Sequence, residues 1–230
     1  MHVVFIIRRF YPLMQGGAEI MMKQVMEALI PRGYKFTVLT RRLKPDLPYH
    51  DSVSGIEIYR FPKSKRLFRM ASKKWLKENW ETIDIINTFR FDIVGIIGAW
   101  CRDKYKIPHL AETITNEIAN MAQSKKSLKY YKFKKIAKGS DLIHCINQHT
   151  VNLLRKNRIS QEKIWYRPNA VNIELFRPET TVVNQEDQKI TFLFSGRLNK
   201  QKGTDTLVSA WKMIPAELRS NARLIFVGTE

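Results

Sequence analysis

Residues 3–40 read VVFIIRRFYPLMQGGAEIMMKQVMEALIPRGYKFTVLT, and this stretch decides the fold class. Its first residues form a continuous, β-branched apolar run, which is typical of a strand buried on both faces of a sheet. Apolar side chains then recur at helical spacing from Ala18 to Leu29, Gly33 ends the helix, and residues 35–40 read as a second strand. Strand, glycine-containing loop, helix and strand together predict a βαβ unit with a right-handed crossover in a parallel sheet.

The same alternation of strands and helices continues further along the chain. Strands are expected at residues 55–61, 84–87, 108–113, 142–146 and 163–167. The helices expected between them are a basic helix within 60–80, a helix at 92–105, a lysine-rich helix within 123–139 and a helix at 150–155. This order predicts an α/β, doubly wound, Rossmann-like domain.

A second unit follows residues 177–188, a polar segment without periodicity that reads as a linker. Residues 190–194, 203–214 and 223–227 then read as strand, helix and strand. We expect an amino-terminal domain over 1–176 and the first βαβ unit of a second Rossmann-like domain over 189–230. That second domain looks incomplete, because one βαβ unit cannot bury its own faces. The 230 residues correspond to about one and a half domains, at about 150 residues per domain.

The composition is ordinary for a globular protein except in its charge. Hydrophobic residues make up 44% and charged residues 27%, which excludes a disordered chain, a collagen-like chain and a disulfide scaffold. The formal net charge of +19 indicates a polyanionic partner or an anionic surface. Residues 60–80 and 123–139 each carry a net charge of +7, so most of the excess lies in two patches.

The first patch has the periodicity of an amphipathic helix. Its expected apolar arc is formed by Leu67, Phe68, Ala71 and Trp75. Its expected basic face is formed by Arg66, Arg69, Lys73, Lys74 and Lys77. The second patch contains Lys125, Lys126 and Lys129 and has no clean apolar stripe, because its apolar residues spread around the helix: Tyr130, Tyr131, Phe133 and Ile136.

Three partners suit such patches. A basic amphipathic helix can lie in an anionic headgroup region, or it can pack on its own domain and leave its basic face free to touch phosphates. We favour the packed surface helix. Basic residues interleaved with aromatic ones also suit single-stranded nucleic acid, but no nucleic-acid-binding module accompanies them. We therefore expect an acceptor at an anionic membrane surface and regard nucleic acid as a poor fit.

The expected compartment is the cytoplasm. Within it, a peripheral position on the inner face of the membrane is also compatible with the basic patches. Cys101 and Cys145 cannot build a disulfide framework and fit a reducing environment. The apolar run at the amino terminus is short and precedes its charges, which is unlike a signal peptide. No stretch approaches the ~20 apolar residues that span a bilayer. No close cluster of cysteine and histidine indicates a metal site.

Two glycine-containing loops have the character of phosphate-binding loops. Gly16 and Gly17 precede a helix, where backbone N–H groups and the positive helix end attract an anion, although a tight turn explains them equally. The second loop reads SGRLNKQKG over 195–203 and places Arg197 and Lys202 between a strand and a helix. Open α/β sheets bind ligands at that edge, and an arginine can grip a diphosphate with two parallel hydrogen bonds.

Four stretches, taken in order, give the chain its resemblance to a known family. They are Gly-Gly-Ala-Glu at 16–19, Ser-Asp-Leu-Ile at 140–143, Pro-Asn-Ala-Val-Asn at 168–172 with Phe-Arg-Pro at 176–178, and Gly-Arg at 196–197 with Lys-Gly at 202–203. Residues 224–228 match a further strand and its glycine, Gly228. With these motifs the chain resembles the glycosyltransferases of family 4, which are retaining, use nucleotide sugars and have two Rossmann-like domains (the GT-B fold).

The resemblance implies an acceptor-binding amino-terminal domain and a carboxy-terminal domain that binds a nucleotide-diphosphate sugar. Arg197 and Lys202 match the pair that neutralises the donor diphosphate without a metal, so no cofactor is expected. Gly16, Gly17 and Glu19 match the cleft loop, although Glu19 also suits the dipole of the helix it begins. Gly196, Gly203 and Gly228 match the donor-domain loops. The implied activity is hexosyl transfer with retention through an oxocarbenium-like transition state, in cell-surface polysaccharide or glycolipid synthesis.

The chain departs from the family pattern at three places. Ile114 stands about where the family often has a histidine near the reacting sugar, and His109 lies earlier, where a core role is expected. Ala170 replaces a usual glycine, and the two donor-domain glutamates of the family fall beyond Glu230. The alternatives are therefore an inactive fragment, a non-catalytic membrane or nucleic-acid adaptor derived from such an enzyme, and another two-domain enzyme such as a sugar-nucleotide epimerase.

Overall fold

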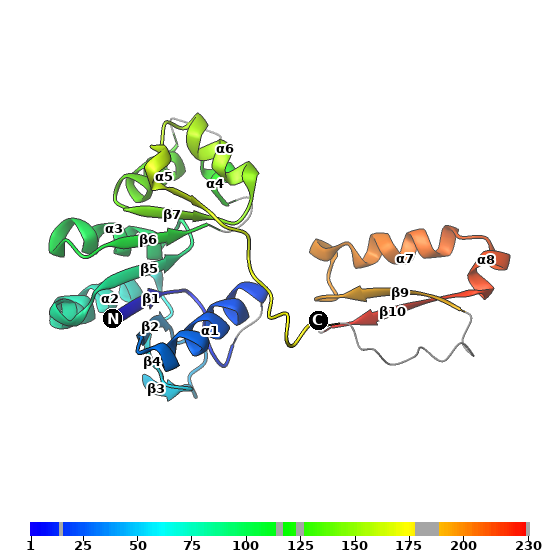
Figure 1. The fold of residues 1–230 in the computed structure, drawn as a ribbon, viewed down its shortest axis with the longest axis horizontal. Coiled ribbons are helices and arrows are strands. Elements are labelled where there is room, and N and C mark those ends of the chain that lie inside the picture. The colour runs from blue at the N-terminus through cyan, green and yellow to red at the C-terminus, as the bar shows by residue number, and fades with distance from the viewer. Residues whose placement is uncertain (14–15, 114–116, 123–126, 178–188, 229–230) are drawn as a thin grey trace. The chain divides into compact units, whose positions relative to one another are not determined.

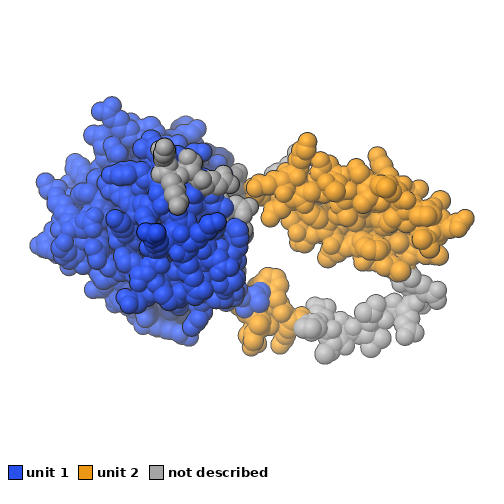
Figure 2. Space-filling view, turned by 90° about the horizontal axis from the view of Figure 1, so that it is seen from above, with its two compact units in different colours: residues 1–171 blue, residues 172–230 orange. Residues whose placement is uncertain are grey.

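A computed structural model describes residues 1–13, 16–113, 117–122, 127–177 and 189–228 of the chain. The chain divides into two compact units, residues 1–171 and 172–230 (Figures 1 and 2). The expected linker at 177–188 lies outside the described residues except for Arg177, so its boundaries stay a prediction. Each unit is described by itself.

Unit 1 is built on one eight-stranded sheet with the order β3-β4-β2-β1-β5-β6-β7-β8 (Figure 1). The strands are β1 (His2–Ile6), β2 (Lys35–Arg41), β3 (His50–Val53), β4 (Ile56–Phe61), β5 (Ile85–Phe89), β6 (His109–Glu112), β7 (Leu142–Cys145) and β8 (Ile164–Tyr166). Every pairing is parallel except that of β3 with β4, which adds an antiparallel edge strand that the sequence pattern did not predict. The predicted doubly wound α/β fold is confirmed.

Helices cover both faces of this sheet. They are α1 (Gly17–Leu29), α2 (Lys65–Asn79), α3 (Ile93–Tyr105), α4 (Glu117–Ala122), α5 (Leu128–Lys138) and α6 (Gln148–Lys156). Single 3₁₀ turns occur at Ile30–Arg32, Trp80–Thr82 and Gln161–Lys163. The short helix α4 was not expected from the sequence.

Strand β1 explains why the first apolar run is continuous. Val3 and Phe5 pack with Met22 and Met26 of α1 on one face. Val4 and Ile6 belong to the cluster on the other face, together with apolar residues of α2 and α3. A strand with helices on both sides has no polar face, so its sequence shows no alternation.

The apolar face of α2 differs from the predicted one. The buried residues are Phe68, Ser72 and Leu76, which follow one another at a spacing of four. Leu67 is 50% exposed, so its predicted place in the apolar arc is wrong. Trp75 lies at the flank of the buried line, where its ring meets that of Tyr59 at 5.2 Å.

Helix α5 also differs from its prediction, because it does have an apolar stripe. Phe133, Ile136 and Ala137 are buried, and Tyr130 packs against the same cluster. Tyr131 is exposed. The lysines between these positions made the pattern look irregular, since three consecutive turns supply the buried side chains at spacings of three and four.

Unit 2 contains one parallel strand pair, β9 (Ile190–Ser195) with β10 (Ala222–Val227), as the sequence predicted (Figure 1). The 3₁₀ turn Lys200–Lys202, helix α7 (Thr204–Met213) and the unexpected short helix α8 (Ala216–Ser220) connect them. None of residues 189–228 is fully buried, and Leu193 remains 64% exposed in the middle of its strand. Two strands and two helices are too few to enclose a core.

Among the helices of the described residues, none is long and apolar enough to cross a bilayer.

Gly98 provides a test of the packing between α3 and the sheet. A Cβ atom there would lie 2.3 Å from Nε2 of His109 and 2.6 Å from Cγ2 of Thr88, and both of these residues are buried. We expect Gly98→Ala to lower the free energy of unfolding by about 1–3 kcal/mol, the usual cost of overpacking. Urea unfolding measures it.

The matched control for this substitution is Gly17→Ala. Gly17 also lies in a helix, and a Cβ there would have no heavy atom within 4 Å. Alanine is the better helix former, so the control should not lose stability. Equal losses in the two variants would contradict the packing described for α3.

Candidate functional site

The carboxyl edge of the unit 1 sheet is where a ligand is expected. The chain leaves β1 toward β2 on one side and continues through β5 to β8 on the other, so the strand order reverses beside β1. Open α/β sheets bind ligands outside the carboxyl ends of the strands at such a switch point. The loop after β1, which leads to Gly16 and Gly17, starts at this edge.

A buried arginine fixes the loop that follows β1. Arg60 on β4 is 1% exposed, and its Nη2 donates to the carbonyl of Tyr11 at 2.9 Å and to Oδ2 of Asp51 at 3.1 Å. Its Nη1 also donates to the carbonyl of Pro48 at 3.3 Å. Sequence reasoning missed Arg60, although it occupies the inward face of the alternating strand that also carries Ile56 and Ile58.

The predicted cleft residues come together at the amino end of α1. Gly16 is the N-cap, Gly17 begins the helix and Glu19 lies in the first turn. A Cβ on Gly16 would lie 2.6 Å from Oε2 of Glu19, so this carboxylate folds back over the glycine. A carboxylate there suits the positive helix end. The role of these residues toward a ligand stays a prediction.

A carboxylate and a histidine lie together at the ends of β6 and β7. Glu112 accepts a hydrogen bond from Nδ2 of Asn87 at 2.8 Å and lies 3.4 Å from Nδ1 of His144. The Nε2 of His144 lies 2.9 Å from the carbonyl of Arg167. Burial by itself lowers the pKa of His144, but Glu112 and this carbonyl outweigh it and raise the pKa above its ordinary value. Both ring nitrogens thus face acceptors, which favours the imidazolium.

The sequence reading also missed the pair of Glu112 and His144. The signal available was a histidine inside the apolar run of residues 142–146, where a polar side chain needs a partner. Ile114, which stands where the family often has a histidine, lies outside the described residues.

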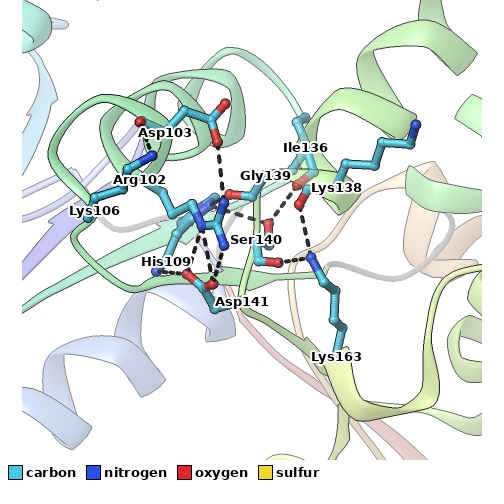
Figure 3. A network of polar contacts seen from close by, with 10 residues as sticks. All are labelled: Arg102, Asp103, Lys106, His109, Ile136, Lys138, Gly139, Ser140, Asp141 and Lys163. Carbon is cyan, nitrogen blue, oxygen red and sulfur yellow. Dashed lines mark hydrogen bonds and ion pairs between the residues drawn. The ribbon is translucent and has the colours of Figure 1, made fainter.

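The Ser140-Asp141 motif is a structural junction (Figure 3). Asp141 accepts hydrogen bonds from Nη2 of Arg102 at 3.0 Å and from the backbone N–H of His109 at 2.9 Å. Burial by itself raises the pKa of Asp141, but these bonds outweigh it and hold the pKa below its ordinary value. Lys163 donates to the carbonyl of Ser140 at 2.7 Å. The motif therefore ties α3, β6, β7 and the segment before β8 together.

His109 is a core residue, as expected. It is 1% exposed, with Nε2 2.7 Å from Oγ1 of Thr88 and Nδ1 2.9 Å from the carbonyl of Gly139. Burial lowers its pKa to about 4, and the Gly139 carbonyl opposes that shift only in part. The ring is neutral near pH 7, with Nδ1 as the donor to Gly139.

In unit 2 the predicted donor loop is compact. The N–H of Gly196 donates to the carbonyl of Val227 at 2.9 Å, and Gly228 passes so close that a Cβ on it would lie 1.8 Å from the carbonyl oxygen of Gly196. Gly203 has a left-handed φ of 74° and caps the turn before α7. Arg197 and Lys202 are both exposed on this loop. Their ligand stays a prediction.

The two basic patches of the sequence meet on one surface. Lys73 on α2 places its Nζ 4.1 Å from the ring centroid of Trp100 on α3. Burial lowers the pKa of Lys73, and Arg69 and Lys135 lower it further, so charges from both patches act on it. The remaining predicted residues on α2 and α5 are exposed: Arg66, Arg69, Lys74, Lys77 and Lys129. Lys125 and Lys126 lie outside the described residues.

No group of three or more His, Cys, Asp and Glu residues that could hold a metal ion occurs in the described part of the chain. Cys101 and Cys145 are buried, and burial raises their thiol pKa values to about 12 and about 11. Both thiols are therefore protonated and unreactive near neutral pH.

Comparison with known proteins gives family matches over both units. Residues 15–175 match the model of Glycosyltransferase Family 4, and residues 177–230 match that of Glycosyl transferases group 1. An uncharacterized glycosyltransferase of Methanocaldococcus jannaschii is 22% identical over 251 residues, which cover 100% of this chain and 63% of the relative. The chain thus spans less than two thirds of that relative's length.

Solved structures give the same architecture. Sucrose-phosphate synthase from Thermosynechococcus elongatus superimposes with a TM-score of 0.76 at 20% identity, over 99% of this chain and 62% of that chain. Anabaena HepE in complex with UDP and glucose has a TM-score of 0.67 at 14% identity, over 99% of this chain and 61% of that chain. At these identities the likeness establishes the fold alone.

The burial of His109 predicts an acid-sensitive fold. Its pKa is about 4 in the folded chain against an ordinary value of 6.5, so the unfolded chain binds the proton more readily and stability falls as the pH falls through this interval. The full contribution is about 3 kcal/mol, at about 1.4 kcal/mol per pKa unit. Urea unfolding between about pH 7 and pH 5 measures the upper part of it.

The variant His109→Gln tests whether His109 causes this loss of stability. In this variant the free energy of unfolding should change less between about pH 7 and pH 5. His144→Gln is the control, because the raised pKa of His144 makes its contribution present at low pH and lost as the pH rises. If the free energy of unfolding of His109→Gln falls with pH as steeply as that of the unmodified chain, His109 is not the cause of the acid sensitivity.

Proposed function

Because the chain belongs to glycosyltransferase family 4, we propose that it acts in a transferase that moves a hexosyl group, with retention, from a nucleotide-diphosphate sugar to an acceptor. Unit 1 would bind the acceptor, and the loop of residues 196–203 would bind the donor diphosphate. The chain covers 63% of the Methanocaldococcus jannaschii relative and 62% of the sucrose-phosphate synthase chain, so the activity proposed is that of the whole protein. Nothing in the comparisons supports the alternative of a non-catalytic adaptor.

The observation that carries the donor site is the loop between β9 and α7. It holds two exposed cations, Arg197 and Lys202, at the carboxyl end of a strand, and glycines at 196 and 228 let two backbone segments approach closely. The match to the Glycosyl transferases group 1 model over this unit supports the proposal of a donor site here. HepE, of the same fold, was solved with UDP, which makes UDP the first nucleotide to try.

The chemistry required of this loop is stabilisation of a leaving group. When the bond from the anomeric carbon to the donor diphosphate breaks, negative charge develops on the diphosphate oxygen. Arg197 can donate two parallel hydrogen bonds to two oxygens of the diphosphate, and Lys202 adds a point charge. Positioned cations that meet a developing charge lower the barrier, and here they would replace a metal ion.

The proposed setting is the inner face of a membrane, in the synthesis of a cell-surface polysaccharide or glycolipid. The surface formed by α2, α3 and α5 supports this, because basic residues of both patches meet there around Lys73 and Trp100. Such a surface is attracted to anionic lipid, at about 1 kcal/mol per basic residue close to the membrane. The acceptor would then be a glycan or a lipid-linked sugar.

Calorimetric titration with UDP tests the donor site. Arg197→Gln and Lys202→Gln should each weaken UDP binding by about ten- to hundredfold, because a hydrogen bond to a charged group contributes about 1.5–3 kcal/mol. Lys200→Gln is the matched control, since Lys200 is an exposed lysine of the same loop that the proposal does not use. Unchanged UDP affinity in both test variants, or an equal loss in the control, would overturn the assignment.

A further inference from the structure

The chain that leaves the sheet of unit 1 is held at Arg167. Strand β8 ends at Tyr166, and beyond it the chain continues without regular secondary structure (yellow in Figure 1). The N–H of Arg167 donates to the carbonyl of Cys145 at 3.1 Å, and Nε2 of His144 lies 2.9 Å from the carbonyl of Arg167. Within the described part of the chain, no hydrogen bond joins residues 168–171 to the sheet, and unit 2 begins at residue 172.

The ring of His144 stands between this carbonyl and a buried carboxylate. Its Nδ1 lies 3.4 Å from Oε2 of Glu112, the last residue of β6. The other oxygen of Glu112 accepts a hydrogen bond from Nδ2 of Asn87 at 2.8 Å, which fixes the carboxylate. The strand register pairs Glu112 with His144 and His144 with Trp165, so these side chains lie on one face of the sheet. His144 therefore connects the end of β6 to the chain just beyond β8.

The surroundings of His144 favour its protonated form. Burial lowers the pKa of His144, but the hydrogen bonds to Glu112 and to the carbonyl of Arg167 outweigh it. Asn87 of β5 and Trp165 of β8 are uncharged, and the Trp165 ring lies 4.9 Å from the His144 ring, where an indole attracts a cation. The guanidinium of Arg167 donates through Nη1 to the carbonyl of Tyr166 at 2.9 Å. Among the described residues, Glu112 is thus the charged side chain that acts on the ring.

Loss of the proton must break one of the two contacts of the ring. The imidazolium has an N–H on each nitrogen, whereas the neutral ring has one N–H and a lone pair that would face an acceptor. The side chain of Glu112 is 9% exposed, so its carboxylate would be left without this donor in a buried place. Arg167 is exposed, so water can replace the donor to its carbonyl. The remaining proton therefore stays on Nδ1, and the carbonyl of Arg167 is released.

A purely structural role does not require a group that titrates. The strand ladder already joins β6, β7 and β8 through their backbones. An uncharged donor such as a glutamine amide would hold the carbonyl of Arg167 equally at every pH. Histidine is the side chain whose charge changes near neutral pH, and it stands at the point where the chain departs toward unit 2.

We propose that His144 is a pH-dependent anchor for the chain that leads from unit 1 to unit 2. When the ring is protonated, it binds Glu112 and the carbonyl of Arg167 together and fixes the chain at the end of β8. When the ring loses its proton, the carbonyl is released and residues 167–171 gain freedom. The anchor lies within unit 1 and does not depend on the activity proposed for the whole protein.

Nuclear magnetic resonance of the full chain between about pH 5 and pH 8 tests the proposal, because histidine titrates in this range. The quantity to follow is the protection factor of the Arg167 amide, which is its exchange rate relative to the intrinsic rate at the same pH. It should fall about two- to tenfold as His144 loses its proton, as expected for one lost hydrogen bond. The ring ¹⁵N shifts should then show the proton on Nδ1. A constant protection factor across the titration of His144, or a neutral ring with its proton on Nε2, would overturn the proposal.

Three variants separate His144 from other causes of pH dependence. His144→Gln should abolish the change in protection at Arg167, and His149→Gln, which replaces an exposed histidine of α6, should leave it intact. Glu112→Gln should lower the pH at which the ring titrates and, by the same amount, the pH at which the protection changes. The same pH-dependent change in His144→Gln would overturn the proposal. If that variant does not fold, a shift of the ring titration in Glu112→Gln without a shift at Arg167 would overturn it equally.

Discussion

The parallel pairing of β1 with both β2 and β5 is the constraint on which the rest of unit 1 depends. It directs the carboxyl ends of the central strands to one edge, and it reverses the strand order beside β1. The core on both sides follows, since β1 must bury alternate side chains under α1 on one face and under α2 and α3 on the other.

The sequence predicted this architecture well because strands buried on both faces have a distinctive pattern of apolar residues. The continuous apolar run at residues 3–7 and the helical spacing after Gly17 each correspond to one physical environment. The amphipathic face of α2 was less predictable, since Leu67 and Leu76 are equally apolar and only tertiary packing decides that Leu76 is buried and Leu67 exposed. Edge strand β3 left no apolar signal, because its residues His50–Val53 are mostly polar and none is fully buried.

The candidate sites also differ in whether the sequence alone predicts them. The proposed donor loop is visible in the sequence because its glycines and cations are close together in the chain. Arg60 and the pair of Glu112 and His144 could not be found in this way, since each depends on strands that the sheet brings together from distant parts of the chain. Conversely, the Ser140-Asp141 motif looked like part of a functional signature, and its contacts are those of a structural junction (Figure 3).

Hydrogen exchange measured by mass spectrometry, with and without UDP, tests the central proposal, that the loop of residues 196–203 binds the donor and the carboxyl edge of unit 1 does not. The account predicts slower exchange of backbone amides in residues 196–203 and at Gly228, and no change at the carboxyl edge of the unit 1 sheet. Protection confined to the carboxyl edge of unit 1, with residues 196–203 unaffected at saturating UDP, would contradict it.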